Sequence, residues 1–482
     1  MKQHATSPTP SSPAPPNAGF DATTRTILIL LGTVVFIAVV NGTMINVALP
    51  HIGRDFGVSE GTYGWLVTGY TLTFGIFSAI NGRLADMLGK KRLYMFGILM
   101  LGLNSLAVAA SPYIELAIAL RFLQGAGAAA LPVLGTSIIK EIVSPQQQGK
   151  AVGYILSTVG VAASIGPFLG GVIVQFAHWR VVFMITGLVL VMFPLALKVL
   201  PESLNEVDGK NFDWVGALLL SAGIGALLYG FEMLENRAVL WMFLTTIGVG
   251  VGSLVAFGFW IMRKDNPFAH PATFKRTKYL ASCVAAATTN AARFGTVVLT
   301  PIFLTEINHL EPLGVGAVLF PGAVMIALLS ARAGNWADRV GARMPVVVGM
   351  IAMILGALVS AVYAGGSPIG VGVGMTLFGV GFAFTQSPLV SAVNRMLPRE
   401  EAGSGVGLFM MIFFVGGAAG VAASVTAIEL QPPMIDGLFG LTTGARGKFT
   451  NAILMLSTLL AVGMLFAPML PAGAEKETKK AA

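Results

Sequence analysis

Residues 82–92 read GRLADMLGKKR, and residues 334–343 read GNWADRVGAR. The two stretches share a glycine, an aspartate and a second glycine at the same spacing: Gly82, Asp86 and Gly89 in the first, and Gly334, Asp338 and Gly341 in the second. Each stretch lies between two long apolar runs, so it marks a tight turn between helices. Repeated halves that enclose a site at their interface are typical of secondary transporters. The repeat therefore predicts two structurally similar halves.

The composition indicates a chain whose solvent is largely lipid. The sequence has 482 residues, of which 55% are hydrophobic and 11% are charged, whereas soluble domains carry about 25% charged residues. Fourteen apolar runs are each long enough for a helix of roughly 20 residues, the length that spans a bilayer. We expect membrane helices at 27–49, 63–80, 93–110, 114–138, 151–177, 181–200, 215–233, 239–262, 279–305, 313–333, 345–364, 369–393, 403–428 and 449–470.

The positive charges predict the orientation in the membrane. An even number of spans puts both termini on one side, and the cytoplasmic side carries the excess of Lys and Arg. Of the 30 Lys and Arg residues, the predicted outer loops hold only Arg54, Arg180, Arg237, Arg446 and Lys448. We therefore expect both termini in the cytoplasm. Residues 1–24, rich in Pro and Ser, are expected to be a disordered tail, and residues 471–482 a second cytoplasmic tail.

The repeat and the apolar runs together predict the domain organisation. The expected fold is an all-α integral membrane protein with two six-helix bundles, at 25–200 and 265–470. Residues 201–264 then form a linker and an inserted hairpin made of the seventh and eighth helices.

The repeated turns carry charges that can hold helix ends together. Asp86 can pair with Arg83 or Arg92, or lie near a helix N-terminus, where the helix dipole favours an anion. Asp338 is followed directly by Arg339, which offers the same kind of pair in the second turn. The alternative is a solvated loop whose positive charges only orient the chain. Because the turn occurs twice, we favour a gate at the predicted inner surface.

Four motifs together resemble the major facilitator superfamily, and in particular its fourteen-span drug:proton antiporter branch. GRLADMLGKKR is similar to the signature between the second and third helices of the superfamily, and RFLQGAGAA (121–129) to its fourth-helix signature. GPFLGG (166–171) is similar to the fifth-helix signature of antiporting members, and NVALP (46–50) resembles the end of their first helix. The resemblance covers about residues 25–470 and points to bacterial tetracycline antiporters and multidrug exporters. It implies the major facilitator fold.

The fifth-helix motif also has a physical meaning of its own. Pro167 lacks a backbone N–H, so the helix can bend there. Gly166 and Gly170 lie one turn apart and allow close approach of a neighbouring helix. Together with Gly171 they form either an ordinary small-residue contact or a pliant seam between the halves, and we favour the seam.

A permanently charged side chain, Arg121, lies within the apolar stretch AIALRFLQGAGAAALP (117–132). A charge near the bilayer centre is costly unless it is paired or hydrated, so Arg121 must face protein or water. Gln124 follows three residues later, on the same face of the helix. The resemblance implies that this face lines the central cavity. The alternative is a structural arginine that binds backbone carbonyls across a helix pair.

A second arginine lies inside a predicted span. Arg293 stands in ATTNAARFGTVVLTP (287–301), three residues after Asn290. It forms either a second cationic site in the cavity or a side chain whose stem reaches water near a helix end. Asn41 and Gln386 are further polar candidates for the cavity, although such side chains more often form hydrogen bonds between helices.

The carboxylates leave the proton site open. The resembling family often carries an acid shortly before NVALP, but Asn41 stands at that position here, and an amide cannot titrate. No Asp or Glu lies in the middle third of any predicted span. Proton coupling usually needs a carboxylate whose pKa changes with its surroundings. Asp86 is the first candidate and Glu232, at the predicted outer end of the seventh span, is the second; Glu232 can equally be a surface residue.

The favoured interpretation is a secondary active transporter that exports small amphiphilic, drug-like compounds by proton antiport with alternating access. The alternative is a metabolite or organic-anion transporter of the same fold, not necessarily driven by protons. Two arginines in the spans and the missing acid favour neutral, zwitterionic or anionic substrates over permanent cations. The expected partners are the substrate, protons and the lipid bilayer, with a monomer in the bacterial cytoplasmic membrane.

The same residues argue against other classes of function. A single cysteine, Cys283, excludes a disulfide framework, and no histidines stand at the spacing of metal ligands. No cluster of titratable groups suits an enzyme, so neither a catalytic site nor a cofactor is expected. The net charge of +8 is explained by cytoplasmic Lys and Arg rather than by nucleic-acid binding.

Overall fold

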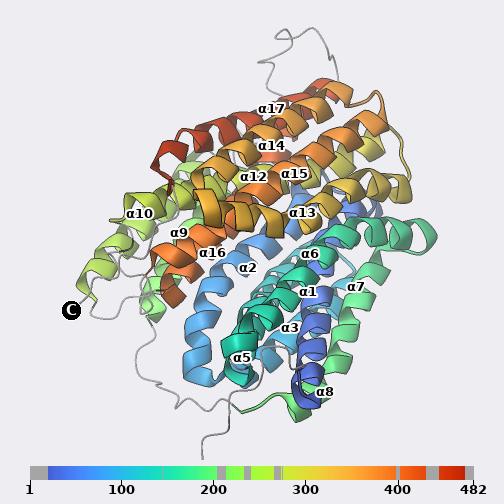
Figure 1. The fold of residues 1–482 in the computed structure, drawn as a ribbon. Coiled ribbons are helices and arrows are strands. Elements are labelled where there is room, and N and C mark those ends of the chain that lie inside the picture. Colours follow the sequence, from blue (N-terminus) through green and yellow to red (C-terminus); the bar gives the residue numbers. More distant parts are fainter. Residues whose placement is uncertain are drawn as a thin grey trace, which may run out of the picture.

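The computed structural model describes residues 20–143, 145–202, 213–232, 240–264, 273, 275–397, 402–429 and 445–472. Within these ranges the chain is almost entirely helical and contains no strand (Figure 1). The tails predicted at 1–24 and 471–482 fall largely outside the described residues, as do residues 203–212 of the predicted linker.

The first half of the chain is built from six helical rods. Two of the rods are interrupted: α4 continues into α5, and α7 continues through the short 3-10 helix η1 into α8. The elements are α1 (Ala22–Phe56), α2 (Glu60–Leu88), α3 (Lys90–Ala109), α4 (Ile114–Ala128), α5 (Ala130–Ile142), α6 (Pro145–Phe176), α7 (Trp179–Gly187), η1 (Leu188–Val191) and α8 (Met192–Val199).

The described residues of the second half form six further long helices after an intervening pair. The pair is α9 (Trp214–Glu232) and α10 (Leu240–Arg263). The remaining elements are α12 (Thr277–Glu306), α13 (Pro312–Val340), α14 (Arg343–Tyr363), α15 (Pro368–Met396), α16 (Ala402–Glu429), α17 (Ala445–Met464) and the short 3-10 helix η5 (Ala467–Met469).

Local signals in the sequence explain where the helices begin and end. Asp21 caps α1 by accepting a hydrogen bond from the Thr24 N–H at 3.2 Å, which satisfies one of the free donors of the first turn. Gly57 ends α1 in the left-handed region with φ 66°, a conformation that glycine adopts without steric cost. Ser59 then caps α2. A short turn is therefore enough to reverse the chain.

Ten described helical segments are long and apolar enough to cross a membrane. The prediction of an all-helical, multi-pass membrane protein is therefore confirmed, whereas the count of fourteen spans stays a prediction. Helix α12 is not among the ten, although the sequence predicts a span at 279–305. Its buried polar residues, such as Thr289, Asn290 and Thr296, face neighbouring helices rather than lipid, so this helix does not need to be apolar all round.

The two halves meet along two pairs of helices. Figure 1 shows α2 beside α16 and α6 beside α13, and both pairs pack closely along their length. The first helices of the halves, α1 and α12, also touch. Each of these contacts joins a helix before residue 200 to one after residue 276, so both halves contribute helices to each seam between them.

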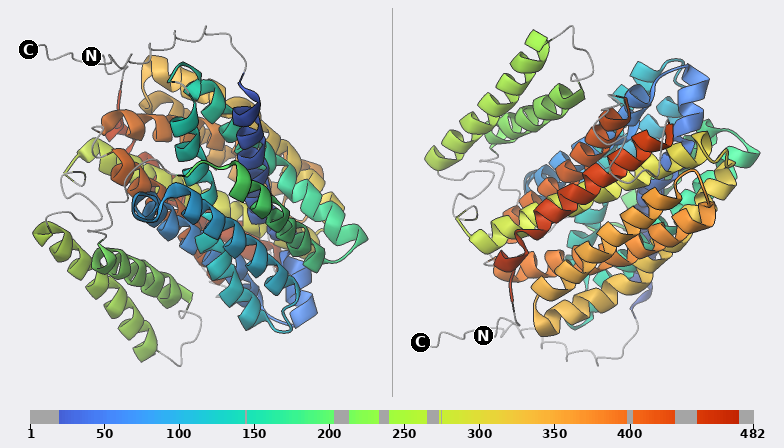
Figure 2. Two further views of the ribbon diagram at one scale, coloured as in Figure 1. Left: turned by 90° about the horizontal axis from the view of Figure 1, so that it is seen from below. Right: turned by 90° about the horizontal axis from the view of Figure 1, so that it is seen from above.

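Helices α9 and α10, drawn in light green, lie to one side of the other helices in both views of Figure 2. They pack on each other, and α9 reaches the main body through α16 and α2. Asp213 joins the pair because it accepts hydrogen bonds from the Gly216 N–H at 2.9 Å and the Trp260 indole N–H at 2.7 Å. Residues 233–239 lie outside the described residues, so the inserted hairpin stays a prediction.

Candidate functional site

The guanidinium of Arg121 lies at the centre of the first half. Its Nε donates to the carbonyl oxygen of Leu66 on α2 at 2.8 Å, and its Nη1 donates to Asn41 Oδ1 on α1 at 2.9 Å. Nη1 also donates to Gln124 Oε1, the contact that a three-residue spacing on one helix predicts. The ring of Tyr70 lies under the guanidinium, 4.0 Å from the charged carbon to the ring centroid.

The partners of Arg121 are themselves held by further hydrogen bonds. Gln124 Nε2 donates to Ser105 Oγ on α3 at 2.5 Å, and Asn41 Nδ2 donates to Thr186 Oγ1 on α7 at 3.0 Å. The polar network therefore joins five helices of one bundle. Such networks fix side-chain positions when all members are bonded.

Arg121 is fully buried and points into protein, away from lipid. In this conformation the guanidinium has no exposed surface, so it does not line an open cavity. Its Nη2 makes no hydrogen bond within the described part of the chain. A buried donor without a partner carries a desolvation cost. A hydrogen bond from Nη2 to an incoming acceptor would remove this cost, so Nη2 is available to donate one.

Arg293 lies in the second half on α12, the counterpart of α1 rather than of α4. Its charged carbon is 4.5 Å from the ring centroid of Phe382 on α15. Asn290, one turn before it, donates from Nδ2 to the Phe413 carbonyl on α16 at 2.8 Å. Arg293 is half-buried, as is Gln386 on α15. Among the described residues, neither Arg121 nor Arg293 forms an ion pair with a carboxylate.

A row of aromatic side chains connects the two arginines across the halves. It was not predicted from the sequence, because its members come from α2, α15 and α16. Phe74 and Phe414 are half-buried, whereas the other rings are buried. The consecutive distances between guanidinium carbon and ring centroid, or between ring centroids, are Arg293–Phe382 4.5 Å, Phe382–Phe413 6.5 Å, Phe413–Phe414 5.2 Å, Phe414–Phe74 4.6 Å, Phe74–Tyr70 6.0 Å and Tyr70–Arg121 4.0 Å.

The glycines of the fifth-helix motif lie on both sides of α6. A Cβ on Gly166 would meet Thr43 Oγ1, and one on Gly170 would lie 2.6 Å from the Met44 carbonyl oxygen, so both face α1. Gly171 faces the other half instead, against the backbone of Pro312 on α13. The kink-prone Pro167 also approaches α13, because a Cβ on Gly316 would lie 2.7 Å from the Pro167 carbonyl oxygen.

The repeated turns have the same backbone geometry in the two halves. Gly89 has φ 86° and Gly341 has φ 87°, and their N–H groups donate to the carbonyls of Ala85 and Ala337 at 3.0 and 2.9 Å. A side chain at either glycine would strain the left-handed backbone. This backbone conformation therefore explains why glycine stands at both of these positions in the repeat.

The charged residues of the predicted gates are only partly described. Arg92 and Arg339 are exposed. The side chains of Arg83, Asp86, Asp338 and Glu232 lie outside what the structure describes, and so does the surface of Gly82. Their roles as gate or proton site stay predictions.

A cleft of about 520 Å³ opens between the halves at the predicted outer end. The first half contributes Arg54, Glu60 and Tyr63, and the second half contributes Glu306 and His309. Partial burial of Glu306, followed by the nearby charge of Glu60, raises the pKa of Glu306 to about 7. The sequence did not single out either residue, because nothing in it shows that these two carboxylates from different halves line one cleft.

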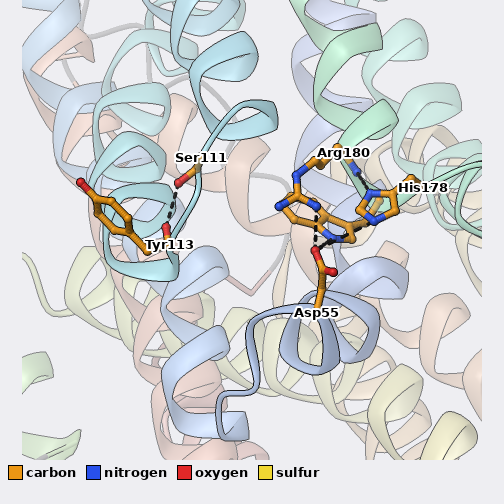
Figure 3. Close-up of polar contacts among 6 residues, drawn as sticks. Asp55, Ser111, Tyr113, His178 and Arg180 are labelled. Atoms are coloured by element: carbon orange, nitrogen blue, oxygen red, sulfur yellow. Dashed lines mark hydrogen bonds and ion pairs between the residues drawn. The ribbon is translucent and has the colours of Figure 1, made fainter.

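The end of α1 beside this cleft is tied to α7. Asp55 accepts hydrogen bonds from Arg180 Nη1 at 2.7 Å and from Trp179 Nε1 at 3.0 Å, and Figure 3 shows Arg180 and His178 around its carboxylate. Ser111 Oγ donates to the Tyr113 carbonyl at 2.8 Å in a neighbouring turn (Figure 3). These partners all belong to the first half, so they stiffen one wall of the outer end.

A comparison with protein families identifies the family to which this chain belongs. Residues 31–421 match the model of the Major Facilitator Superfamily. The chain belongs to the major facilitator superfamily. Members of this superfamily that resemble it are transporters, so the prediction that the protein is not an enzyme is confirmed. Within the described residues, no group of three or more potential metal ligands comes together.

Relatives within the superfamily include drug-resistance proteins. The chain is 30% identical over 407 residues to the multidrug resistance protein Stp of Mycobacterium tuberculosis, covering 82% of this chain and 74% of the relative. It is 28% identical to the puromycin resistance protein pur8 of Streptomyces alboniger, with 82% and 80% covered. It is also 25% identical to the riboflavin transporter RibZ of Clostridioides difficile, with 82% and 86% covered.

Solved structures support the major facilitator fold. A bacterial homologue of the human lysosomal transporter Spinster, in an inward-facing and unoccupied conformation, aligns with a TM-score of 0.66 at 13% identity. That alignment covers 94% of this chain and 98% of the other. The peptide transporter POT in complex with sulfate aligns with a TM-score of 0.65 at 16% identity, covering 92% and 95%.

Proposed function

We propose that this transporter exports small, flat, aromatic drug-like compounds by proton antiport with alternating access. The relatives named for multidrug and puromycin resistance support export of drug-like molecules. At each of the two seams, one helix comes from the first half of the chain and the other comes from the second half. This arrangement suits rocking of one half against the other. The two halves lie in one chain, so we expect a monomer to be sufficient.

The observation that carries the proposal is the aromatic row between Arg121 and Arg293. Aromatic rings favour offset or edge-to-face contacts with other rings, and the half-buried Phe74 and Phe414 offer ring surface from both halves. A flat aromatic molecule can replace the contact between these two rings when the halves separate. Binding of such a molecule between the rings is therefore coupled to the separation of the two halves.

The charges at the two ends of the row favour particular substrates. Both ends are guanidinium groups, and neither pairs with a carboxylate among the described residues. An anionic or zwitterionic group on a substrate gains a charge-assisted hydrogen bond from Arg121 Nη2, whereas a permanent cation is repelled. The family's usual first-helix acid is replaced by Asn41, which is consistent with this preference.

The remaining site residues have proposed roles in movement. Gly166, Pro167, Gly170 and Gly171 form the seam at which α6 slides or bends between α1 and α13. Asp86 with Arg83, and Asp338 with Arg339, close the inner side. We place both termini and these gates on the cytoplasmic side of a bacterial inner membrane, from the distribution of Lys and Arg.

A second candidate function is transport of a metabolite by the same fold. The relative RibZ favours it, because this protein is named a riboflavin transporter and matches over 82% of the chain. A flat aromatic metabolite suits the same row of rings. The two functions differ in direction, in driving force and in the compound carried.

Transport into everted membrane vesicles tests the proposal. Vesicles from cells that express or lack the protein receive fluorescein as an anion, tetracycline as a zwitterion and ethidium as a cation. We expect accumulation of fluorescein and tetracycline that requires an acidic interior and stops when a protonophore collapses the gradient. Accumulation that ignores the gradient removes proton antiport, and a preference for ethidium removes the proposed charge selectivity.

A further inference from the structure

The seam between α6 and α13 has three layers of contact towards the predicted outer end of the two helices, which lie side by side in Figure 1. Residues four positions apart lie on one face of a helix. Two such stripes meet here, and they consist of Pro167, Gly171 and Gln175 on α6, and of Pro312, Gly316 and Phe320 on α13. In the innermost layer the ring of Phe320 contacts that of Phe168, with centroids 5.6 Å apart.

The middle layer brings the two backbones together. A Cβ on Gly316 would lie 2.7 Å from the Pro167 carbonyl oxygen, and a Cβ on Gly171 would meet the Pro312 carbonyl oxygen. Each glycine therefore faces a proline of the opposite helix. Small residues at such a crossing let helix backbones approach closely, so this layer fixes how α6 and α13 are aligned.

The outermost layer is polar and joins the two halves by a hydrogen bond between side chains. Gln175 Nε2 donates to Glu311 Oε2 at 2.5 Å. An ionised carboxylate only accepts hydrogen bonds, so the amide of Gln175 must turn its donor towards the opposite half. A hydrogen bond to a charged acceptor is stronger than one between neutral groups. This layer therefore adds a specific tie across the seam.

The side chain of Glu311 is directed away from its own helix. Glu311 is the N-cap residue of α13, but its carboxylate accepts no hydrogen bond from the described N–H groups of the first turn, the usual role of an N-cap side chain. It reaches α6 instead, while the positive end of the helix dipole still favours its charge. The residue therefore serves the contact between the halves.

The polar layer can open and close at low cost. Glu311 is exposed and Gln175 is half-buried, so water can replace their hydrogen bond when the helices separate. The other seam, between α2 and α16, has an apolar contact at its predicted outer end, where a Cβ on Gly64 would lie 3.3 Å from Val425 Cγ2. Separation there exposes apolar surface to water, which is unfavourable.

We infer that Gln175 and Glu311 form a polar latch that holds the outer end of the α6–α13 seam shut. The glycine–proline layer below the latch keeps the two side chains in register. Release of substrate to the outside requires the latch to open, and its closure favours the return of the transporter to the state described here. This inference rests on the alternating-access part of the proposed function.

Distances between spin labels test the latch. Full-length protein in lipid nanodiscs carries labels at Tyr113→Cys and Ile369→Cys, two exposed positions at the predicted outer end, one in each half. Cys283 is buried and stays in place. Gln175→Leu removes the donor and keeps a side chain of similar size. We expect it to lower the ratio of short to long distances about tenfold, the effect of losing one hydrogen bond to a charged group.

Exchanging the two residues gives the sharper test. Gln175→Glu alone places two carboxylates opposite each other, so repulsion opens the outer end further than Gln175→Leu does. Combining Gln175→Glu with Glu311→Gln restores one donor and one acceptor with their positions reversed. We expect the combined variant to return to within about threefold of the wild-type ratio. A misfolded protein cannot show this recovery, so the rescue separates loss of the latch from loss of the fold.

Glu115→Gln is the matched control, because Glu115 is an exposed carboxylate in the first turn of α4 at the same end; its ratio should equal that of the wild type. Wild-type ratios in Gln175→Leu and Gln175→Glu overturn the latch, as does a combined variant that stays as open as Gln175→Glu. The labels report without substrate or gradient. Failure of the latch therefore leaves the vesicle assay of export unaffected, and failure of proton antiport leaves these distances unchanged.

Discussion

The ring of Phe74 on α2 meets the ring of Phe414 on α16 with centroids 4.6 Å apart and planes inclined by 60°. This contact joins the two halves at the middle of the aromatic row, between Arg121 and Arg293. Because both rings are half-buried, they are the members of the row that a substrate can reach first. The contact therefore serves as a closure in the absence of substrate and as a binding surface in its presence.

Replacing Phe414 with alanine is expected to weaken substrate binding. Removing one aromatic contact of about 1.4 kcal/mol raises the half-saturating concentration of fluorescein or tetracycline in everted vesicles about tenfold. Phe96→Ala is the control, because Phe96 is 55% exposed on α3 and faces the predicted lipid. Equal affinity in both variants would remove the aromatic row from substrate binding.

Arg121→Lys is expected to keep the charge and lose transport. A lysine carries its three donors on one nitrogen at the end of a flexible stem, so it cannot reach Leu66, Asn41 and Gln124 together as the two nitrogens of the guanidinium do. We expect less than about one tenth of the wild-type rate, and a loss of about 1–3 kcal/mol in the free energy of unfolding from unsatisfied buried acceptors. Vesicle transport and chemical unfolding in detergent measure the two effects.

The matched control for this change is Arg263→Lys on α10. Arg263 is exposed, so its replacement should alter neither rate nor stability. Wild-type transport by Arg121→Lys would show that a point charge at this position is sufficient and that the fork of hydrogen bonds is dispensable.

Asn41→Asp is expected to shift the substrate preference towards cations. The new carboxylate lies beside Arg121, whose Nη1 already bonds to Asn41 Oδ1 at 2.9 Å, and it neutralises the positive end of the aromatic row. We expect the ratio of ethidium to fluorescein transport to rise about tenfold. Asn394→Asp, at an exposed position on α15, is the control, and an equal shift there would attribute the effect to net charge alone.

Gly171→Ala is expected to hold the outer end apart. The added methyl group meets the Pro312 backbone of the opposite half, and backbone cannot move aside as a flexible side chain can. Spin labels at Tyr113→Cys and Ile369→Cys, two exposed positions at the predicted outer end, one in each half, should then lie farther apart than in the wild type. Gly248→Ala on α10 is the control, because a Cβ there meets nothing within 4 Å; unchanged distances in both variants would place the seam elsewhere.

The stability of the protein is expected to fall as pH rises through neutrality. The folded protein raises the pKa of Glu306 from its ordinary value of 4.5 to about 7, so the folded state binds this proton more tightly than the unfolded state. The resulting contribution is fully present below pH 4.5 and is lost as pH rises through about 7. Melting temperatures at about pH 5.5 and pH 8 should differ by more in the wild type than in Glu306→Gln, and equal differences would contradict the assignment.

Features within one helix or one turn could be predicted from the sequence. The spacing of Arg121 and Gln124 placed them on one face, where they now bond to each other. The repeated glycines predicted matching turns, and Gly89 and Gly341 share the same left-handed backbone. These predictions succeed because helix periodicity and the steric limits of φ act locally and do not depend on how distant segments pack.

Contacts between distant helices could not be predicted in this way. The sequence indicated Asp86 and Glu232 as candidates for a proton site and gave no sign that Glu60 and Glu306, which stand at helix ends, line one cleft. Only the packing of the two halves brings them together. The one available signal was the position of Glu306 directly after an apolar run. The aromatic row was missed for the same reason, since single phenylalanines in apolar helices carry no pairing information.

The polar character of α12 has a consequence for biosynthesis. A segment that carries Arg293, Asn290 and several threonines gains little by partitioning alone from the translocation channel into lipid. We therefore expect α12 to remain near the channel until its companions α15, α16 and α17 have been translated. The second half then enters the bilayer as a preassembled group, and a chain truncated just after α12 lacks the neighbours that make this helix tolerable in the membrane.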